Sequence, residues 1–309
     1  MSKILNIGSL NSDHVYSVNR FVAAGETLAA GSLHYYPGGK GLNQSVALSR
    51  AGAQVFHAGK TGPDGAPLIA WLRETGVDAS HIRTDGSVTG HAVIQVASSG
   101  QNCILLYHGA NFELERSHLD NVFSSFEKGD FLVLQNEVNE IPYMMEQASK
   151  MGMSIAFNPS PFDRTVVDFP LELVSLFILN EIEGSEITGE KNPAGILNSM
   201  AGRFPQAAII LTLGEEGVLY RDNKQELSHG IYHVPVVDTT AAGDTFTGFF
   251  IACTAEGMNP ADALALASAA SALTVTRSGA SSSIPTRSEA ESALLSGFSC
   301  FRMSGENSN

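Results

Sequence analysis

Short runs of apolar residues alternate with amphipathic stretches along most of the chain. The runs have the length of buried β-strands and occupy residues 3–8, 54–58, 131–134, 154–157, 176–179 and 208–213. The stretches have helical periodicity, most with Gly or Pro at an edge, over residues 42–51, 66–75, 141–150, 193–203, 244–256 and 260–277. This alternation predicts an α/β fold, with a doubly wound, mainly parallel sheet and helices on both faces. In such folds ligands bind at the carboxyl ends of the strands.

Two segments interrupt the alternation. Residues 13–36 and 90–108 are rich in β-formers and turn residues, and the second has the pattern of a β-hairpin. Together they are predicted to form a small separate sheet within a single domain that spans residues 1–309. Two interpretations of this sheet stay open, namely surface hairpins without a function or a lid over a pocket at the strand ends.

Charge and composition narrow the class of protein. The chain has 32 acidic and 18 basic residues, a net charge of −14, without long blocks of one sign, which argues against a nucleic-acid partner. Its apolar runs are too short for a signal peptide or a membrane span, so we expect a cytoplasmic protein without membrane contact. Cys103, Cys253 and Cys300 lack paired or metal-type spacing and are interpreted as core residues.

Two widespread nucleotide-binding motifs are missing. Gly59-Lys60-Thr61 looks like the end of a P-loop, but Gln54 occupies the position where that motif requires glycine. No Gly-x-Gly-x-x-Gly sequence follows the first predicted strand. The sequence therefore argues against a P-loop NTPase and against a nicotinamide-dependent oxidoreductase.

Polar and glycine-rich clusters follow several predicted strands instead. They are Asn11-Ser-Asp13, Pro37-Gly-Gly-Lys-Gly-Leu-Asn-Gln44, Gln135-Asn-Glu137, Asn180-Glu-Ile-Glu183 and Leu211-Thr-Leu-Gly-Glu-Glu-Gly217. Each alone has a structural explanation as an Asx turn, a flexible loop or a helix cap. Jointly they place amide, carboxylate, lysine and glycine groups at the strand ends where a doubly wound sheet binds ligands.

A further cluster, Asp238-Thr-Thr-Ala-Ala-Gly-Asp244, places small residues directly before a carboxylate at the start of a helix. A helix cap explains Asp244 by itself, because a carboxylate there accepts backbone N–H bonds and complements the helix dipole. It does not explain the small residues. Those are typical of an anion site, where small side chains let a ligand reach several N–H groups. Both interpretations stay open on the residues alone.

Together with Asn158-Pro-Ser-Pro161 and Thr276-Arg-Ser-Gly279, these clusters resemble, in order and over nearly the full chain, the ribokinase-like sugar kinases. Asp-Thr-x-Ala-Ala-Gly-Asp is the signature of that family, and the lysine of Gly-Gly-Lys-Gly favours its ribokinase branch. The resemblance implies ATP-dependent phosphorylation of a primary sugar hydroxyl, giving ribose 5-phosphate from ribose. The alternatives are another pentose, a ketohexose or a nucleoside as acceptor, and, from a different class, a non-catalytic sugar-binding or regulatory protein.

The resemblance also implies roles for individual residues. Asp244 would be the general base, and the backbone N–H groups of Ala242 and Gly243 would form an anion hole for the transferred phosphoryl group. The sugar would be held by Asn11, Asp13, Gly39, Lys40, Asn43 and Glu137, together with Asp244. The nucleotide site would be lined by Asn180, Thr212, Gly214, Gly217, Gly243 and Ser268.

Two metal ions and a second subunit are implied in the same way. Asn180 and Glu183 would organise Mg²⁺ through waters. A monovalent cation, K⁺ in ribokinase, would lie beside the anion hole near Asp238, Thr240, Thr274, Arg277, Gly279 and Ser283. The lid would join two chains in a homodimer. Three positions depart from the pattern, since Leu42, Leu179 and Ser268 stand where relatives usually have alanine, proline and, in bacterial ribokinase, a histidine beside the adenine.

Overall fold

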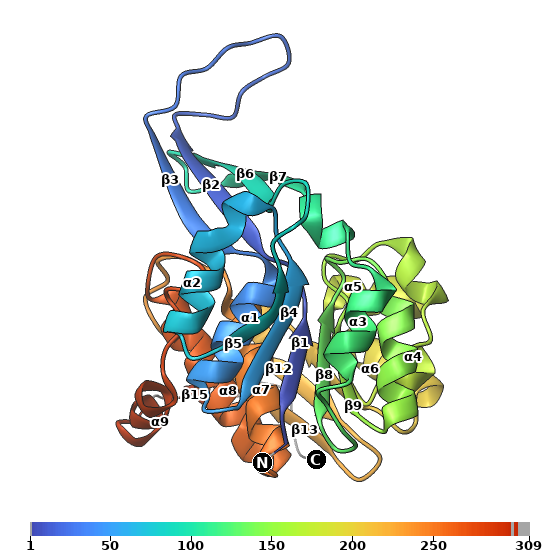
Figure 1. The fold of residues 1–309 in the computed structure, drawn as a ribbon. Helices are drawn as coiled ribbons and strands as arrows, with labels where there is room; N and C mark the ends of the chain where they lie inside the picture. Colours follow the sequence, from blue (N-terminus) through green and yellow to red (C-terminus); the bar gives the residue numbers. More distant parts are fainter. Residues whose placement is uncertain (1, 298–299, 302–309) are drawn as a thin grey trace.

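A nine-stranded sheet forms the centre of the computed structural model, which describes residues 2–297 and 300–301 (Figure 1). The strand order is β13-β12-β11-β10-β9-β8-β1-β4-β5. Pairing is parallel from β11 to β5, and β12 and β13 join the edge by antiparallel pairing. The strands are β1 (Ile4–Ile7), β4 (Val55–Lys60), β5 (Asp78–Arg83), β8 (Phe131–Gln135), β9 (Ser154–Asn158), β10 (Leu176–Asn180), β11 (Ala208–Thr212), β12 (Val218–Arg221) and β13 (Glu226–His229).

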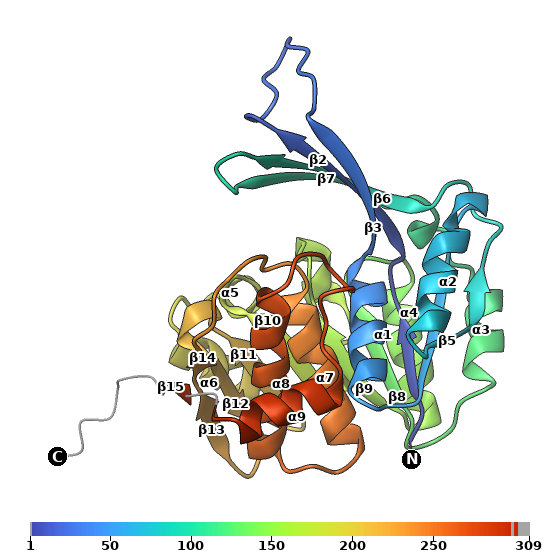
Figure 2. The same ribbon diagram turned by 90° about the vertical axis from the view of Figure 1, so that its left-hand side faces the viewer.

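Helices cover both faces of this sheet (Figures 1 and 2). One face carries α1 (Lys40–Arg50), α2 (Ala66–Glu74), α7 (Ala242–Ala255) and α8 (Pro260–Val275), with α9 (Arg287–Leu295) packed on α8. The other carries α3 (Arg116–Phe123), α4 (Ile141–Met151), α5 (Glu181–Thr188) and α6 (Pro193–Arg203). Each face has its own apolar core, and β1 contributes to both because its side chains alternate, Ile4 to one and Leu5 to the other.

The predicted doubly wound fold is confirmed, and each predicted strand and helix is present with ends shifted by at most a few residues. Elements that the sequence pattern did not indicate are α3, α9, β5, the antiparallel edge of β12 and β13, and a two-stranded sheet of β14 (Ile231–Tyr232) and β15 (Cys300–Phe301). Cys253 is buried as predicted, whereas Cys103 is exposed on β7 (Asn102–Tyr107), so its interpretation as a core residue is wrong. The side chain of Cys300 lies outside the described part. No helix within residues 2–297 is long and apolar enough to span a bilayer.

The chain order reverses between β1 and β8. From β1 the chain adds β4 and β5 on one side, and from β8 it adds β9, β10 and β11 on the other. At such a switch point the loops that follow the two central strands diverge and leave a crevice at their carboxyl ends. Here those loops begin after Ile7 and after Gln135, which places the clusters around Asn11 and Glu137 beside this crevice.

A separate four-stranded sheet, in the order β3-β2-β6-β7, projects from the carboxyl end of the main sheet (Figures 1 and 2). Its strands are β2 (Asn11–Val18), β3 (Ser32–Gly38), β6 (Gly90–Ala97) and β7 (Asn102–Tyr107), close to the two predicted segments. β2 follows β1 after three residues, and β3 leads directly into α1. The second sheet is therefore continuous with the segments that carry the clusters around Asn11 and Lys40.

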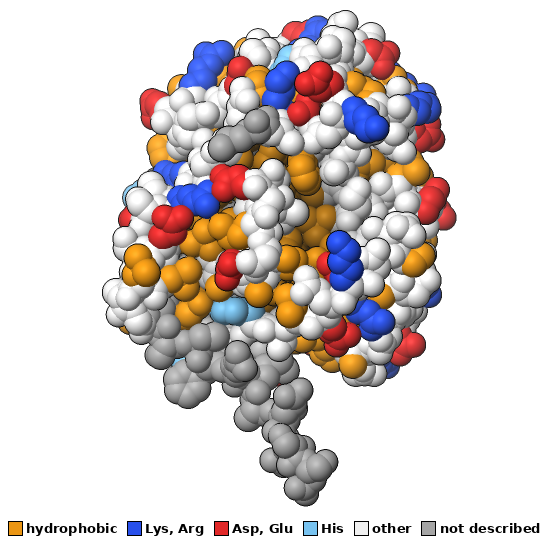
Figure 3. Space-filling view, turned by 90° about the horizontal axis from the view of Figure 1, so that it is seen from below, with side chains coloured by type: hydrophobic (Ala, Val, Ile, Leu, Met, Phe, Trp, Pro, Cys, Tyr) orange, Lys and Arg blue, Asp and Glu red, His pale blue; other side chains and the backbone are white. Residues whose placement is uncertain are grey.

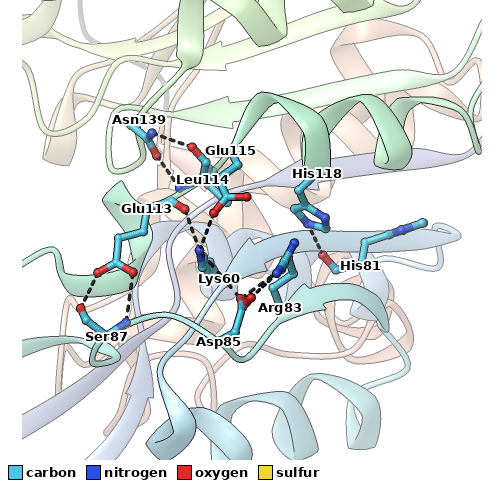
Figure 4. Close-up of polar contacts among 10 residues, drawn as sticks. All are labelled: Lys60, His81, Arg83, Asp85, Ser87, Glu113, Leu114, Glu115, His118 and Asn139. Carbon is cyan, nitrogen blue, oxygen red and sulfur yellow. Dashed lines mark hydrogen bonds and ion pairs between the residues drawn. The ribbon is translucent and has the colours of Figure 1, made fainter.

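Lys60 fixes the linkers that enter and leave β6 and β7 (Figure 4). It is buried at the end of β4, and its Nζ donates to the carbonyl of Glu113 at 3.0 Å. Ion pairs to Asp85 at 3.8 Å and Glu115 at 3.5 Å offset the cost of burying its charge. Ser87 in one linker also donates its backbone N–H to the carboxylate of Glu113 in the other, at 3.0 Å. The lysine that resembled the end of a P-loop thus has structural contacts that account for its charge.

The opposite end of the molecule carries acidic and basic side chains interspersed (Figure 3). A cavity of about 630 Å³ opens where the segments before β1 and β8 approach the end of α7, lined by Ser2, Glu127, Lys128, Gly129, Asp130, Ala255 and Glu256. None of the residues predicted for catalysis or binding contributes to it. The candidate site is therefore at the other end, where the strands finish.

Candidate active site

Asp244 lies in the first turn of α7, at the third helical position. The turn begins at Ala241, which has φ 61° and ψ 8°, a left-handed conformation that is uncommon for a residue with a Cβ. No side chain in the described part of the chain caps this helix. The Ala242 N–H donates to the carbonyl of Thr239 at 3.3 Å, and the N–H groups of Gly243 and Asp244 follow it at the helix start.

Asp244 is 7% exposed, and its carboxylate is held by α1. Asn43 donates Nδ2–H to Oδ2 at 3.0 Å, and Gln44 donates Nε2–H to Oδ1 at 3.0 Å. The interpretation of Asp244 as a cap of its own helix is therefore wrong, because Ala241 is the N-cap and the carboxylate is bound across the interface between two helices. Asn43 Oδ1 is buried without a partner among the described residues, an expensive condition that a ligand hydroxyl would relieve.

Gly243 occupies open space. A Cβ built at this residue would have no atom within 4 Å, apart from its chain neighbours and the backbone of its own helix. Gly41 differs, because its Cβ would collide with the backbone of Gly8 and Ser9, so packing of α1 on the loop after β1 requires glycine there. Packing does not require Gly243. Its missing side chain leaves room beside the N–H groups of a helix N-terminus, the geometry that binds phosphate.

Glu137, Lys40 and Asp13 bring charge to the same edge. Glu137 is buried and accepts hydrogen bonds from Ser9 Oγ and from the Lys40 backbone N–H, the latter at 3.0 Å. Burial raises the pKa of Glu137 above its usual range, against the opposing effect of Lys40. Burial alone would lower the pKa of Lys40, but the carboxylates of Asp244, Glu137 and Glu183 together raise it. The lysine is therefore charged at neutral pH and lies among these acids.

Asp13 rests against Gly38, where a side chain would overlap its carboxyl group. Burial, with a contribution from Glu137, raises the pKa of Asp13 to about 7 from an ordinary value of 3.8. Between these two values the folded protein binds more protons than the unfolded chain, so the contribution of Asp13 to stability falls as the pH rises from about 4 to 7.

Substitution of Asp13 by asparagine is expected to stabilise the free protein at pH 8 and to have little effect at pH 5. The carboxamide stays neutral, which removes the cost of ionising a desolvated carboxyl group. We expect a gain of about 1 kcal/mol, or roughly 2–4 °C in Tm, at pH 8. Thermal unfolding of both proteins at the two pH values measures it. An equal gain at pH 5 and pH 8 would contradict the assignment.

Asn11 is held by a residue that sequence reasoning did not identify. Asn111 donates Nδ2–H to Asn11 Oδ1 at 2.8 Å and accepts the Leu10 N–H at 2.9 Å. One hundred residues separate the two asparagines. Asn111 lies in a short 3₁₀ helix after β7. No motif surrounds it in the sequence, so its contact with Asn11 could not be predicted locally.

Asn180 and Glu183 form a capping box at the start of α5, which confirms the cap interpretation. Glu183 donates its N–H to Asn180 Oδ1 at 2.9 Å, Asn180 returns its N–H to Glu183 Oε2 at 3.0 Å, and Ser160 also donates to the carboxylate. A cavity of about 380 Å³ opens beside them, lined by Phe162, Asp163, Arg164, Asn180, Ile182, Glu183 and Glu186. Within residues 2–297 no three His, Cys, Asp or Glu side chains are grouped closely enough to bind a metal ion directly.

Four of the six residues predicted to line a nucleotide site lie at the ends of β10 and β11 or in the turn after β11, and Gly243 and Ser268 lie on α7 and α8. Thr212 ends β11 and pairs with Asn180 at the end of β10. Gly214 and Gly217 follow it with φ of 57° and 98°, values that favour glycine. Ser268 is half-buried on α8, which packs against β13.

Asp238 connects the segment before α7 to the loop after α8. Its Oδ1 accepts the Thr240 N–H at 2.9 Å, and its Oδ2 accepts the Gly279 N–H at 3.1 Å. Thr274 and Ser283, which precede and follow Gly279 in the chain, are both buried. Their hydroxyls donate to the carbonyls of Ala270 and Ala280. The Arg277 guanidinium pairs with Glu289 at 2.7 Å.

Comparisons with known proteins agree with this geometry. Residues 1–287 match the pfkB family of carbohydrate kinases. The chain is 36% identical to a ribokinase of Haemophilus influenzae, covering 94% of this chain and 97% of the relative, and 33% identical to one of Bacillus subtilis, covering 95% and 100%. The structure of Arabidopsis thaliana ribokinase complexed with ribose and ATP has a TM-score of 0.85 at 27% identity, covering 95% of this chain and 99% of that one. The chain therefore belongs to the pfkB family of carbohydrate kinases.

Proposed function

We propose that this protein is an ATP-dependent sugar kinase that transfers the γ-phosphoryl group to the C5 hydroxyl of ribose. The observation that carries the proposal is the buried Asp244 carboxylate beside the open turn at Gly243, at the carboxyl edge of the sheet. The names of the full-length relatives, and the ribose and ATP in the Arabidopsis complex, support ribose as the acceptor.

In this proposal Asp244 takes the proton of the attacking hydroxyl. Asn43 and Gln44 each donate a hydrogen bond to one of its two oxygens, so the orientation of the carboxylate is fixed before the substrate binds. The N–H groups of Gly243 and Asp244, with a contribution from Ala242, stabilise the negative charge of the phosphoryl group in the transition state of its transfer. Phosphoryl transfer requires mainly in-line positioning and charge neutralisation, which a helix N-terminus and Lys40 supply.

The sugar is proposed to be held by the acceptors and donors at the crevice between β1 and β8. These are Asn11, Asp13, Gly39, Lys40, Asn43 and Glu137. The free Oδ1 of Asn43 and the carboxyl groups of Asp13 and Glu137 suit a ligand with several hydroxyl donors. The four-stranded sheet is proposed to be the lid over this pocket, because β2 and β3 carry Asn11, Asp13 and the residues that lead into α1.

ATP is proposed to bind on the other side of the Asp244 turn, along Asn180, Thr212, Gly214, Gly217 and Ser268. Mg²⁺, when bound to the phosphates, supplies charge neutralisation during transfer. The donor set of Asn180 and Glu183 fits a role through waters, because both carboxylate oxygens of Glu183 already accept hydrogen bonds and one face of the pair borders the 380 Å³ cavity.

The test is ADP release in a coupled assay with ATP and Mg²⁺ across pentoses, ketohexoses, other hexoses and nucleosides. We expect the highest kcat/KM with ribose. A higher kcat/KM with another pentose, a ketohexose or a nucleoside would support the kinase activity but show that the acceptor is not ribose. Absence of turnover with every compound, together with measurable sugar binding by calorimetry, would favour a non-catalytic sugar-binding protein.

A monovalent cation is proposed beside the anion hole, bounded by Asp238 and by the backbone of Thr240, Thr274, Arg277, Gly279 and Ser283. Potassium is expected to raise kcat several-fold over an equal concentration of tetramethylammonium, because a bound cation adds positive charge next to the transferred phosphoryl group. The Asp238→Asn variant is expected to lose this difference. Equal kcat of the wild-type protein in both salts would contradict the proposed cation site.

A homodimer through the lid is proposed from the apolar side chains that the four-stranded sheet exposes. They are Leu33, Tyr35, Tyr36, Ile104, Leu105 and Tyr107. We expect light scattering to give the mass of two chains, and Leu105→Asp to shift it toward one. Leu295→Asp is the control, because Leu295 is 89% exposed on α9, outside the lid. A wild-type mass of one chain would overturn this assembly.

A further inference from the structure

Gln44 is fully buried on α1, and all of its polar atoms are paired. Its Nε2 donates to Asp244 Oδ1 at 3.0 Å and to Asn158 Oδ1 at 3.1 Å, and its Oε1 accepts from Gln135 Nε2 at 2.7 Å. This one amide therefore connects α7 to the carboxyl ends of β8 and β9. These contacts span 91 to 200 residues of sequence.

The partners of Gln44 allow only one orientation of its amide. Asn158 donates its Nδ2–H to the Ile178 carbonyl at 2.9 Å, which leaves its Oδ1 toward Gln44. Gln135 donates Nε2–H to Asn6 Oδ1 at 3.0 Å as well as to Gln44. Rotating the Gln44 amide by 180° would place its oxygen against the Asp244 carboxylate and its N–H groups against those of Gln135. Both contacts would be repulsive in a buried, weakly screening environment.

Asn43 differs from Gln44 in this respect. Its Nδ2 also donates to Asp244, but its Oδ1 has no partner in the described part of the chain. One of the two donors to Asp244 therefore has an oxygen left for a ligand, while the other has both its nitrogen and its oxygen paired inside the protein. The two neighbouring residues divide substrate contact and support of the carboxylate between them.

We propose that Gln44 is a positioning residue that fixes the plane of the Asp244 carboxylate, and that Gln135 and Asn158 hold Gln44 in place. The inference rests on the proposed function, in which Asp244 accepts the proton of the sugar hydroxyl. A carboxylate held through Oδ1 from the protein side keeps Oδ2 aimed at the acceptor pocket whether or not a sugar is bound to Asn43. Such support matters because small losses of alignment at a reacting group cost large factors in rate.

The first test is steady-state kinetics of Gln44→Met, which keeps the length of the side chain and removes its hydrogen bonds. We expect kcat with the best sugar substrate to fall about 10- to 100-fold, with the sugar KM within about twofold of wild type. Ser49→Ala is the matched control, because it removes one hydrogen bond from the same helix, to the Thr75 carbonyl at 2.8 Å, away from Asp244. It is expected to keep the wild-type kcat.

Gln135→Met provides a second test if Gln44→Met folds poorly. It leaves both donors on Asp244 and removes the amide that orients Gln44, together with the bond of that amide to Asn6 Oδ1. A smaller fall in kcat is therefore expected, again without a change in KM. Combining Gln44→Met with Asp244→Asn should lower the rate no further than Asp244→Asn alone, because no base remains to be positioned. A purely structural role of Gln44 predicts that the two losses multiply instead.

The outcomes separate this inference from the proposed function. A wild-type protein without turnover on any sugar would overturn both. An active wild-type protein whose Gln44→Met and Gln135→Met variants keep the wild-type kcat would overturn the inference and leave the kinase intact. A sugar KM that rises in parallel with the fall in kcat, or losses that multiply in the double variant, would likewise overturn the positioning role of Gln44 alone.

Discussion

The Asp244→Asn variant is expected to bind sugar and ATP and to lose about 10²- to 10⁴-fold in kcat, the factor that a positioned general base contributes. The fold should survive the substitution. Asn43 can rotate its amide to accept the new N–H, because its Oδ1 has no other partner among the described residues. Rapid-quench or coupled kinetics measure the rate, and calorimetry measures sugar affinity, which we expect within about tenfold of wild type.

Asp262→Asn is the matched control for this variant. Asp262 occupies the same third helical position in α8 that Asp244 has in α7, and it is exposed rather than buried against α1. Its replacement should leave kcat unchanged. If Asp244→Asn turned over sugar at the wild-type rate, Asp244 would not be the base, and the hydrogen bonds from Asn43 and Gln44 would need another explanation.

The Gly243→Ala variant is expected to be at least as stable as the wild-type protein and to lose about 10²-fold or more in kcat. Apart from its chain neighbours and the backbone of its own helix, a methyl group at this position meets no atom within 4 Å, so the fold has room for it. Alanine also favours the helix by up to about 1 kcal/mol. The same methyl group would occupy the space proposed for the transferred phosphoryl group and would displace it from the helix N–H groups.

Gly202→Ala separates the two effects, since Gly202 also lies in a helix, is exposed and has open space around its Cβ. It should raise Tm without changing kcat. Thermal unfolding and steady-state kinetics of both variants are the measurements. If Gly243→Ala retained full activity, the open space at this turn would not be the path of the phosphoryl group.

Local patterns carried most of the fold prediction. The apolar run of β1 and the apolar stretches of α7 and α8 are visible within single windows of sequence, because at least half of the residues in each element are buried. The element α3 was not predicted, although Leu119, Val122 and Phe123 are buried at helical spacing, because its eight residues give only two turns of pattern. The strands β12 and β13 have four residues each, too short for a distinct period.

The candidate site was predictable where its residues form clusters in the sequence, as around Asn11, Lys40 and Asp244. Its supporting contacts were not. Ser9 meets Glu137 across 128 residues, and Gln44 meets Asp244 across 200. Such pairs exist only after the parallel sheet has brought the ends of distant strands together. Gln44 itself stood in a predicted cluster, but nothing in the sequence distinguished an amide that faces a carboxylate from one that faces solvent.

The left-handed turn at Ala241 has a consequence for engineering heat-resistant forms of this protein. A residue with a Cβ at φ 61° costs roughly 1–2 kcal/mol relative to glycine, so Ala241→Gly is an obvious candidate for a stabilising library. Glycine would also free the backbone directly before the helix that carries Asp244. Selection for heat resistance alone would therefore favour substitutions in the turn whose rigidity the proposed chemistry requires. Such a selection should also measure turnover.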